Sequence, residues 1–261
     1  MNEIITFGKG YTLNPGIKVF IKSAKNICDN VTILSSDLGQ DVKQFAEQAN
    51  ANFYDVAELT KKYNVNNTVS PYTLKVIYFY LYCKHISTAE NVYVCDFTDT
   101  FFNKNVFEIV NNKKPYVTTE NFFIKDCPTN QTWLRVCYNA DILNLLSKYE
   151  IINGTGNVFG NRLAVVELLK EVCVDLAQIM SRVGSYPTID QASLNKVVRF
   201  DAFRYNILNN FEIFNLAHFG NSVVEITSDN KVKIDSKEPY VIHQYDVIKT
   251  LETHFYKVYA K

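Results

Sequence analysis

The first half of the sequence alternates between short apolar segments rich in β-branched residues and longer segments with helical periodicity. We predict strands over 3–8, 31–36, 51–56 and 91–97, and helices over 14–27, 37–50 and 70–86. Asn14-Pro15 and Ser70-Pro71 are typical of helix starts. Strands that alternate with helices over this length predict a parallel sheet wound with crossover connections.

The second half mixes the two kinds of segment. We expect strands at 115–120 and at both ends of 150–161, helices in two pieces over 132–149 with a turn near Asn139, and helices over 162–183 and 188–200. Short strands follow in EIFNLA, SVVEIT and KVKIDS, with a hairpin turn at TSDNKV. Because no repeat, low-complexity tract or linker interrupts the chain, we predict one α/β domain over 1–261. Its sheet is expected to be mixed, mainly parallel and flanked by helices.

Charge and cysteine content exclude several classes of partner. Lys and Arg total 27 and Asp and Glu total 27, so the chain lacks the basic excess typical of nucleic-acid binding. The six cysteines lack the spacing of a zinc site. We see no signal peptide at the N-terminus, and the longest apolar stretch, 76–85, is too short to span a bilayer. We therefore expect a cytoplasmic protein with neither nucleic-acid partner nor membrane span.

Two acids, Asp96 and Asp99, follow the apolar segment NVYVC. Ligands of parallel α/β sheets bind at the carboxyl ends of the strands, so both acids are expected at the ligand-binding edge. Hard divalent cations prefer carboxylate oxygens, often shared with substrate phosphates. The residues leave two interpretations open. Either the acids hold a metal–diphosphate complex, or Asp96 caps the next element and Asp99 pairs with a lysine such as Lys104.

Three later stretches carry further polar candidates. INGTGNVFGN contains Asn153 and Gly154, which suit a close approach to ligand hydroxyls, and it also reads as a plain hairpin turn. DQASLN places Asp190 and Gln191 at a helix start, where Asp190 alone would be an ordinary N-cap. YVIHQYD ends an apolar strand with His243, and a lone histidine there is more often structural than a ligand.

The ordered set Asp96-Phe-Thr-Asp99, NGTGNVFG, DQASLN and IHQYD resembles a family of nucleotide-sugar glycosyltransferases with the GT-A fold, from about Phe7 to Thr253. The resemblance implies a nucleotide-binding half over 1–110 and an acceptor and donor-sugar half over 111–261. It implies a nucleotide-sugar donor, with uridine as the base, and a glycan, protein or lipid-linked sugar as acceptor. Neither retention nor inversion at the sugar follows from it.

The resemblance also implies roles for individual residues. Asp96, Asp99 and His243 would bind Mn²⁺ or Mg²⁺, with Asp96 nearer the ribose or the metal's outer shell. Thr6 and Tyr11 would contact the base, and Lys75 would reach the donor. Asn153 and Gly154 would line the donor sugar. Asp190 and Gln191 would contact sugar hydroxyls, with Asp190 as general base or sugar-orienting carboxylate.

The sequence departs from the family pattern at positions that normally carry cations. Thr98 and Val247 stand where arginine is usual, and Asn103 replaces a glutamine. Lys249 is the expected substitute for a lost cation. These departures leave a catalytically weak nucleotide- or sugar-binding protein of the same fold as an alternative. A phosphatase of the haloacid dehalogenase type is a more distant alternative. Its Asp-x-Asp-x-Thr motif resembles DFTDT, but here the second acid stands one residue further along the chain.

Overall fold

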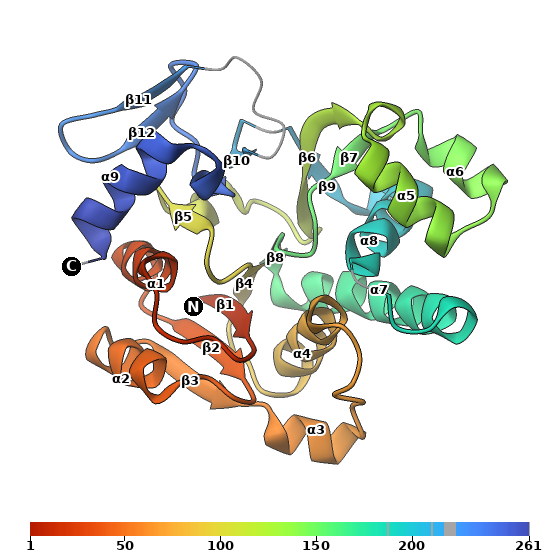
Figure 1. The fold of residues 1–261 in the computed structure, drawn as a ribbon, viewed down its shortest axis with the longest axis horizontal. Helices are drawn as coiled ribbons and strands as arrows, with labels where there is room; N and C mark the ends of the chain where they lie inside the picture. The colour runs from red at the N-terminus through yellow and green to blue at the C-terminus, as the bar shows by residue number, and fades with distance from the viewer. Residues whose placement is uncertain (187, 210, 217–222, 261) are drawn as a thin grey trace.

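The computed structural model describes residues 1–186, 188–209, 211–216 and 223–260. Within them, a central sheet has the strand order β3-β2-β1-β4-β8-β6-β7, with β9 also paired to β6 (Figure 1). Its strands are β1 (Asn2–Gly8), β2 (Val31–Ser35), β3 (Asn52–Asp55), β4 (Asn91–Cys95), β6 (Tyr116–Phe123), β7 (Glu150–Ile152), β8 (Asn157–Asn161) and β9 (Asn206–Leu208). The pairs β1–β2, β1–β4, β2–β3 and β6–β9 are parallel, whereas β8 runs antiparallel to β4 and β6.

Helices cover both faces of this sheet (Figure 1). The α-helices are α1 (Pro15–Ile27), α2 (Gln40–Gln48), α3 (Ala57–Tyr63), α4 (Pro71–His85), α5 (Pro128–Cys137), α6 (Ala140–Leu146), α7 (Arg162–Val183), α8 (Ile189–Phe200) and α9 (Lys249–Tyr259). Successive residues of a strand point to opposite faces, so Ile4 joins the core under α1 and α2, while Ile5 joins the core under α4, α7 and α8. Burial on both faces explains why β4 is apolar from Val92 to Cys95 and why β1 carries the adjacent residues Ile4 and Ile5.

A smaller, three-stranded sheet combines β5, which follows β4 in the chain, with strands from the last part of the chain. It contains β5 (Thr100–Phe102), β13 (Val241–His243) and β10 (Ile213–Asn215), beside the hairpin β11 (Val224–Ile226) and β12 (Val232–Ile234). A third core, in which Phe101 stacks on Phe255 of α9 at 3.9 Å between ring centroids, fixes this sheet next to α1. His243 is paired in register with Thr100, so its side chain is brought to the loop that follows β4.

The predicted α/β class, with a mixed sheet flanked by helices, is confirmed. Helix α3 was not predicted, and the helix expected over 37–50 begins only at Gln40. Asp37 instead accepts a hydrogen bond from the backbone N–H of Gly10 at 2.8 Å. The Asn139 turn is confirmed, since its side chain caps α6. The two strands within 150–161 also form, but they are not a hairpin, because both pair with β6.

None of the helices in the described part of the chain combines the length and the apolar character that a membrane crossing requires. The division into a nucleotide-binding half and a sugar-binding half stays a prediction.

Candidate metal centre

The loop between β4 and β5 carries both acids, and two glycines from distant segments fix its position. A Cβ added at Gly16, in the first turn of α1, would lie 2.3 Å from the carbonyl oxygen of Thr98. A Cβ added at Gly156 would lie 2.0 Å from Asp96 Oδ2. Both distances are shorter than any side chain tolerates, so the loop depends on glycine at these two positions.

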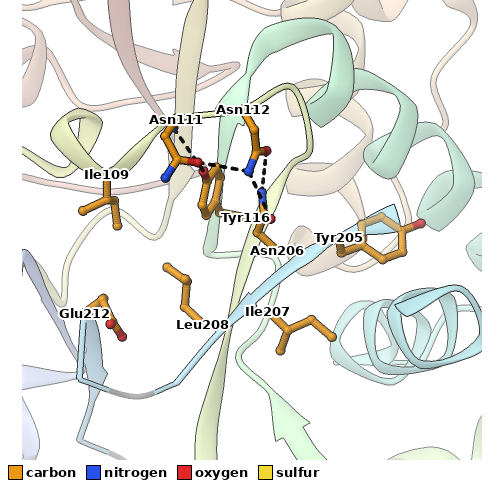
Figure 2. Close-up of a pocket in the computed structure, with 9 residues that line it drawn as sticks. All are labelled: Ile109, Asn111, Asn112, Tyr116, Tyr205, Asn206, Ile207, Leu208 and Glu212. Carbon is orange, nitrogen blue, oxygen red and sulfur yellow. Dashed lines mark hydrogen bonds between the residues drawn. The ribbon is translucent and has the colours of Figure 1, made fainter. Parts of the chain in front are cut away.

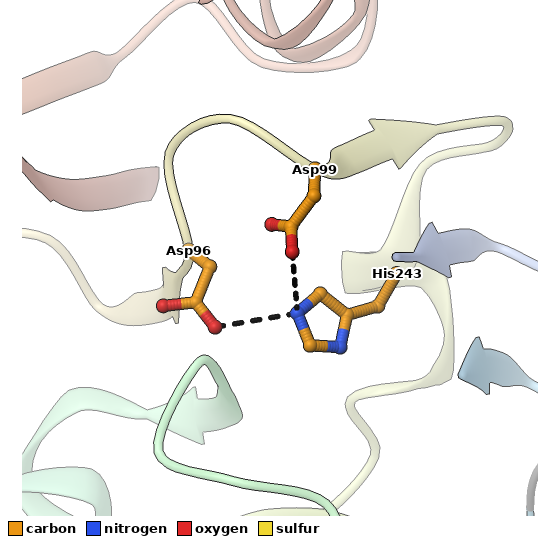
Figure 3. Close-up of side chains that lie close together, drawn as sticks. All are labelled: Asp96, Asp99 and His243. Carbon is orange, nitrogen blue, oxygen red and sulfur yellow. Dashed lines mark ion pairs between the residues drawn. The ribbon is translucent and has the colours of Figure 1, made fainter. Parts of the chain in front are cut away.

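Asp96, Asp99 and His243 converge at this loop (Figure 3). His243 Nε2 lies 3.2 Å from Asp96 Oδ2 and 3.6 Å from Asp99 Oδ2. The candidate ligand atoms of the three residues all lie within 4.8 Å of one another. The carbonyl of Asp99 also accepts a hydrogen bond from Gln244 N at 2.8 Å, which ties β13 to the acidic loop. Segments almost 150 residues apart in the sequence therefore build one cluster.

Lys75, on α4, lies behind the cluster as a buried cation. Its Nζ is 2.6 Å from Asp96 Oδ1 and 3.9 Å from Asp190 Oδ2. Burial acts to lower the pKa of the Lys75 ammonium, but Asp96 and Asp190 outweigh it and the pKa is raised. Burial likewise acts to raise the pKa of Asp96, but the charge of Lys75 outweighs it and the pKa is lowered. The pair is therefore ionised.

Asp99 lacks such a partner. Burial and the negative charge of Asp96 raise the pKa of its carboxyl, although His243 opposes them. Asp99 Oδ1 and both ring nitrogens of His243 are buried and have no hydrogen-bond partner among the described residues, and Nε2 is the nitrogen that faces the two carboxylates (Figure 3). Carboxylate oxygens and an imidazole nitrogen suit Mn²⁺ and Mg²⁺, and a divalent cation would offset the repulsion between the acids. The donor set fits such an ion.

The alternative reading of the acids is not observed. Asp96 pairs with Lys75 and caps no helix, and Asp99 contacts His243 and not Lys104. The Lys104 Nζ lies 4.3 Å from the centroid of the Tyr240 ring instead.

The cluster borders a pocket of about 500 Å³, which is within the range of small-ligand sites. Its walls combine aromatic rings with cations, and they include Phe7, Lys9, Tyr11, Tyr72, Lys75, Phe97, Asp96, Asp99 and His243. Tyr11 and Tyr72 are 37% and 48% exposed, so their rings are open to a ligand. One pocket therefore offers both a stacking surface and the three candidate metal ligands.

Five predicted site residues thus line this pocket, namely Tyr11, Lys75, Asp96, Asp99 and His243. Asp190 joins them through Lys75, and it accepts a hydrogen bond from the Thr155 hydroxyl at 2.8 Å. It is not the N-cap of α8, because Thr188 occupies that position and makes no side-chain cap bond. Thr6 is buried in β1 and donates to Cys95 O at 3.0 Å, so it does not reach the pocket.

The structure also separates Lys249 from the cluster. Its ammonium is 84% exposed on α9 and pairs with Glu252 one turn away. It therefore does not replace the arginine that the family pattern places near this position.

Asn153, Gly154 and Gln191 lie together in a second, buried polar group. Asn153 Oδ1 accepts from Asn215 Nδ2 at 2.9 Å, and Glu120 Oε1 accepts from both Asn215 Nδ2 at 3.1 Å and Gln191 Nε2 at 3.2 Å. A Cβ added at Gly154 would lie 3.4 Å from Gln191 Oε1. Neither Glu120 nor Asn215 was predicted from the sequence. For Glu120 a signal existed, since an acid ends the predicted strand PYVTTE.

No protein-family model matches this chain, and no curated protein matches its sequence. The assignment of function therefore depends on the geometry of the site and on the sequence motifs that form it.

Proposed function

We propose that this protein is a metal-dependent glycosyltransferase that moves a sugar from a nucleotide diphosphate donor, with uridine as the base, to a hydroxyl group of a glycan or another acceptor. The observation that supports the proposal is the convergence of Asp96, Asp99 and His243 at one pocket with the exposed rings of Tyr11 and Tyr72. This combination suits a nucleotide diphosphate, because a base can stack on aromatic rings and phosphates bind a hard cation.

A divalent cation held by Asp96, Asp99 and His243 would neutralise the charge that develops on the diphosphate leaving group. Lys75 provides a second positive charge at the same wall. The carboxylates of Asp96 and Asp190 hold its ammonium in place, so this cation is preorganised toward the pocket. Lys75 thus supplies the positive charge that the missing arginines would have provided and that the exposed Lys249 does not replace.

Asp190 is, in this proposal, the carboxylate that orients the reacting groups. One of its oxygens already accepts from the Thr155 hydroxyl and lies near the Lys75 ammonium. Because Asp190 contacts both the Thr155 hydroxyl and the Lys75 ammonium, we assign it the orientation of Lys75 and of sugar hydroxyls. Gln191 and Asn153 keep, in this proposal, the sugar contacts that the resemblance implies, and the buried Glu120 carboxylate holds the Gln191 amide.

The first test is thermal unfolding with uridine, guanosine, cytidine and adenosine diphosphates, each with and without Mn²⁺, for the wild type and Asp99→Ala. A ligand that binds only the native state raises the melting temperature by mass action. We expect a rise that needs both Mn²⁺ and uridine diphosphate and is lost in Asp99→Ala. A rise that persists in Asp99→Ala, or no rise with any nucleotide, contradicts the metal–diphosphate site.

A binding protein of the same fold that lacks turnover is the second candidate. It is favoured by Val247 in place of arginine and by the pairing of Lys249 with Glu252. The two candidates differ in one measurement. A transferase hydrolyses its nucleotide sugar slowly when no acceptor is present, whereas a binding protein shows the melting shift without release of nucleotide diphosphate.

A further inference from the structure

A second pocket, of about 480 Å³, lies along β9 (Figure 2). It shares no lining residue with the pocket at the acidic loop. Its wall is more polar than apolar, and it combines asparagine amides with the side chains of Ile109, Ile207 and Leu208. The lining includes one carboxylate, Glu212, and it includes neither lysine nor arginine.

The asparagines of this pocket are held rigidly. Asn112 and Asn206 form a reciprocal amide pair, with Nδ2–Oδ1 distances of 2.7 and 3.3 Å. Asn112 Nδ2 also donates to Asn111 Oδ1 at 3.0 Å, and the Tyr116 hydroxyl donates to the same oxygen at 2.9 Å. These bonds occupy the oxygen of Asn111 and leave its Nδ2 with no protein acceptor in the described part of the chain. The pocket therefore presents a fixed, available donor.

The acceptor on the other side is Glu212. Its Oε2 is buried and has no hydrogen-bond partner among the described residues. Its backbone is anchored, because the carbonyl of Glu212 accepts from Tyr240 N at 2.8 Å. Since Oε2 is closed to solvent and Glu212 lines the pocket, a ligand hydroxyl group reaches this carboxylate through its other oxygen, Oε1. A hydrogen bond there offsets part of the cost of holding an unpaired carboxylate in a partly buried place.

We propose that this pocket is a second site, separate from the metal centre, that binds a neutral saccharide. The ligand must donate to Glu212 and accept from Asn111, and it must also cover the apolar side chains. Sugar hydroxyls both donate and accept, and the C–H faces of a sugar ring are apolar. An anion is disfavoured because the only charged group in the lining is the Glu212 carboxylate. An ammonium ion donates only and leaves Asn111 unused.

The test is ligand-observed NMR with methyl β-glucoside, methyl β-galactoside, methyl α-mannoside and methyl β-N-acetylglucosaminide, without nucleotide or metal. We expect at least one of them to bind with a dissociation constant on the order of 1 mM, since the site is small and open. Glu212→Gln is expected to weaken that binding about tenfold, the effect of losing a hydrogen bond to a charged group. Asn111→Ala is expected to weaken it about threefold to tenfold.

The matched control is Glu225→Gln, which removes an exposed carboxylate on β11 and should leave saccharide binding unchanged. Glu212→Gln should remain folded, because it removes an unpaired charge, and thermal unfolding checks this. Butylammonium chloride tests an amine as the ligand. Saccharide binding that is equal in the wild type and Glu212→Gln overturns the proposal, as does binding of butylammonium with none of the glycosides. Neither result bears on the metal–diphosphate site, because the saccharide site does not depend on it.

Discussion

Lys75 Nζ lies 2.6 Å from Asp96 Oδ1 and 3.9 Å from Asp190 Oδ2, so one buried cation joins the loop after β4 to the start of α8. Side-chain exposures of 8% for Lys75 and 6% for Asp190 show that water contributes little to the balance of charge between them. The arrangement has a consequence for stability as well as for ligand binding, because removal of the cation leaves two acids facing each other.

We predict that Lys75→Met lowers the free energy of unfolding by about 3 kcal/mol, the low end of the cost of breaking a buried ion pair, since Asp96 is 29% exposed on its side chain. Urea denaturation followed by circular dichroism measures the change. Lys61→Met on α3 is the control, because this residue is exposed and should change the free energy by less than about 0.5 kcal/mol. Equal effects of the two substitutions would contradict the role of Lys75 in the charge balance.

A second prediction concerns the metal alone. Mn²⁺ at about 100 times its dissociation constant should raise the free energy of unfolding by about 2.7 kcal/mol. Asp99→Asn and His243→Ala should each abolish most of this gain, because each removes one of three ligands that lie within 4.8 Å of one another. Isothermal titration with MnCl₂ measures the binding directly. Glu108→Gln, on the 3₁₀ helix Val106–Ile109, is the control and should bind as the wild type does. Unchanged titration of Asp99→Asn would exclude this metal site.

Much of the fold is visible in the sequence because its signals are local. The alternating apolar strands and periodic helices of the first half indicate the α/β class, and the acids after β4 lie at a pocket. Lys75 lines the pocket at the acidic loop, and its contact with a donor stays a prediction. The pairing of β7 and β8 could not be predicted. Local turn signals suggest a hairpin, and they cannot show that β6 lies between the two strands and pairs with both.

Other parts of the site depend on long-range contacts that leave no local pattern. Asn215 reaches Glu120 only because β10 of the small sheet lies beside β6. Thr6 and Lys249 were expected to contact the nucleotide donor. Instead, the Thr6 hydroxyl donates to the neighbouring strand β4, and the Lys249 side chain faces solvent. Residue type indicates what a side chain can do, whereas its direction depends on packing between segments distant in sequence.

A third prediction concerns Asn195, the last residue of the DQASLN segment on α8. Its side chain accepts from Ile152 N at 2.8 Å and donates to Ile152 O at 3.2 Å, so it completes the backbone pairing of β7. Asn195→Leu would leave both buried backbone groups unpaired, at a cost of about 2 kcal/mol or more in the free energy of unfolding. Mn²⁺ binding per folded molecule should stay unchanged. Loss of Mn²⁺ binding in a variant that is still folded would contradict a purely structural role.

The last prediction uses two glycines in one loop. A Cβ at Gly156 would lie 2.0 Å from Asp96 Oδ2, whereas a Cβ at Gly154 would lie 3.4 Å from Gln191 Oε1, which is an ordinary contact. Gly156→Ala must therefore displace the Asp96 carboxylate or the loop, and we expect it to lower the free energy of unfolding by about 1–3 kcal/mol, the usual cost of overpacking.

Because the same displacement moves Asp96 away from Lys75 and His243, Gly156→Ala should also weaken Mn²⁺ binding by at least about tenfold, the effect of 1.4 kcal/mol. Gly154→Ala should change Mn²⁺ binding by less than about twofold, since its Cβ meets only the end of a flexible side chain. Calorimetric titration of both variants with MnCl₂ makes the comparison. If both variants bind Mn²⁺ equally well, the close approach of Gly156 to Asp96 does not position the metal ligand.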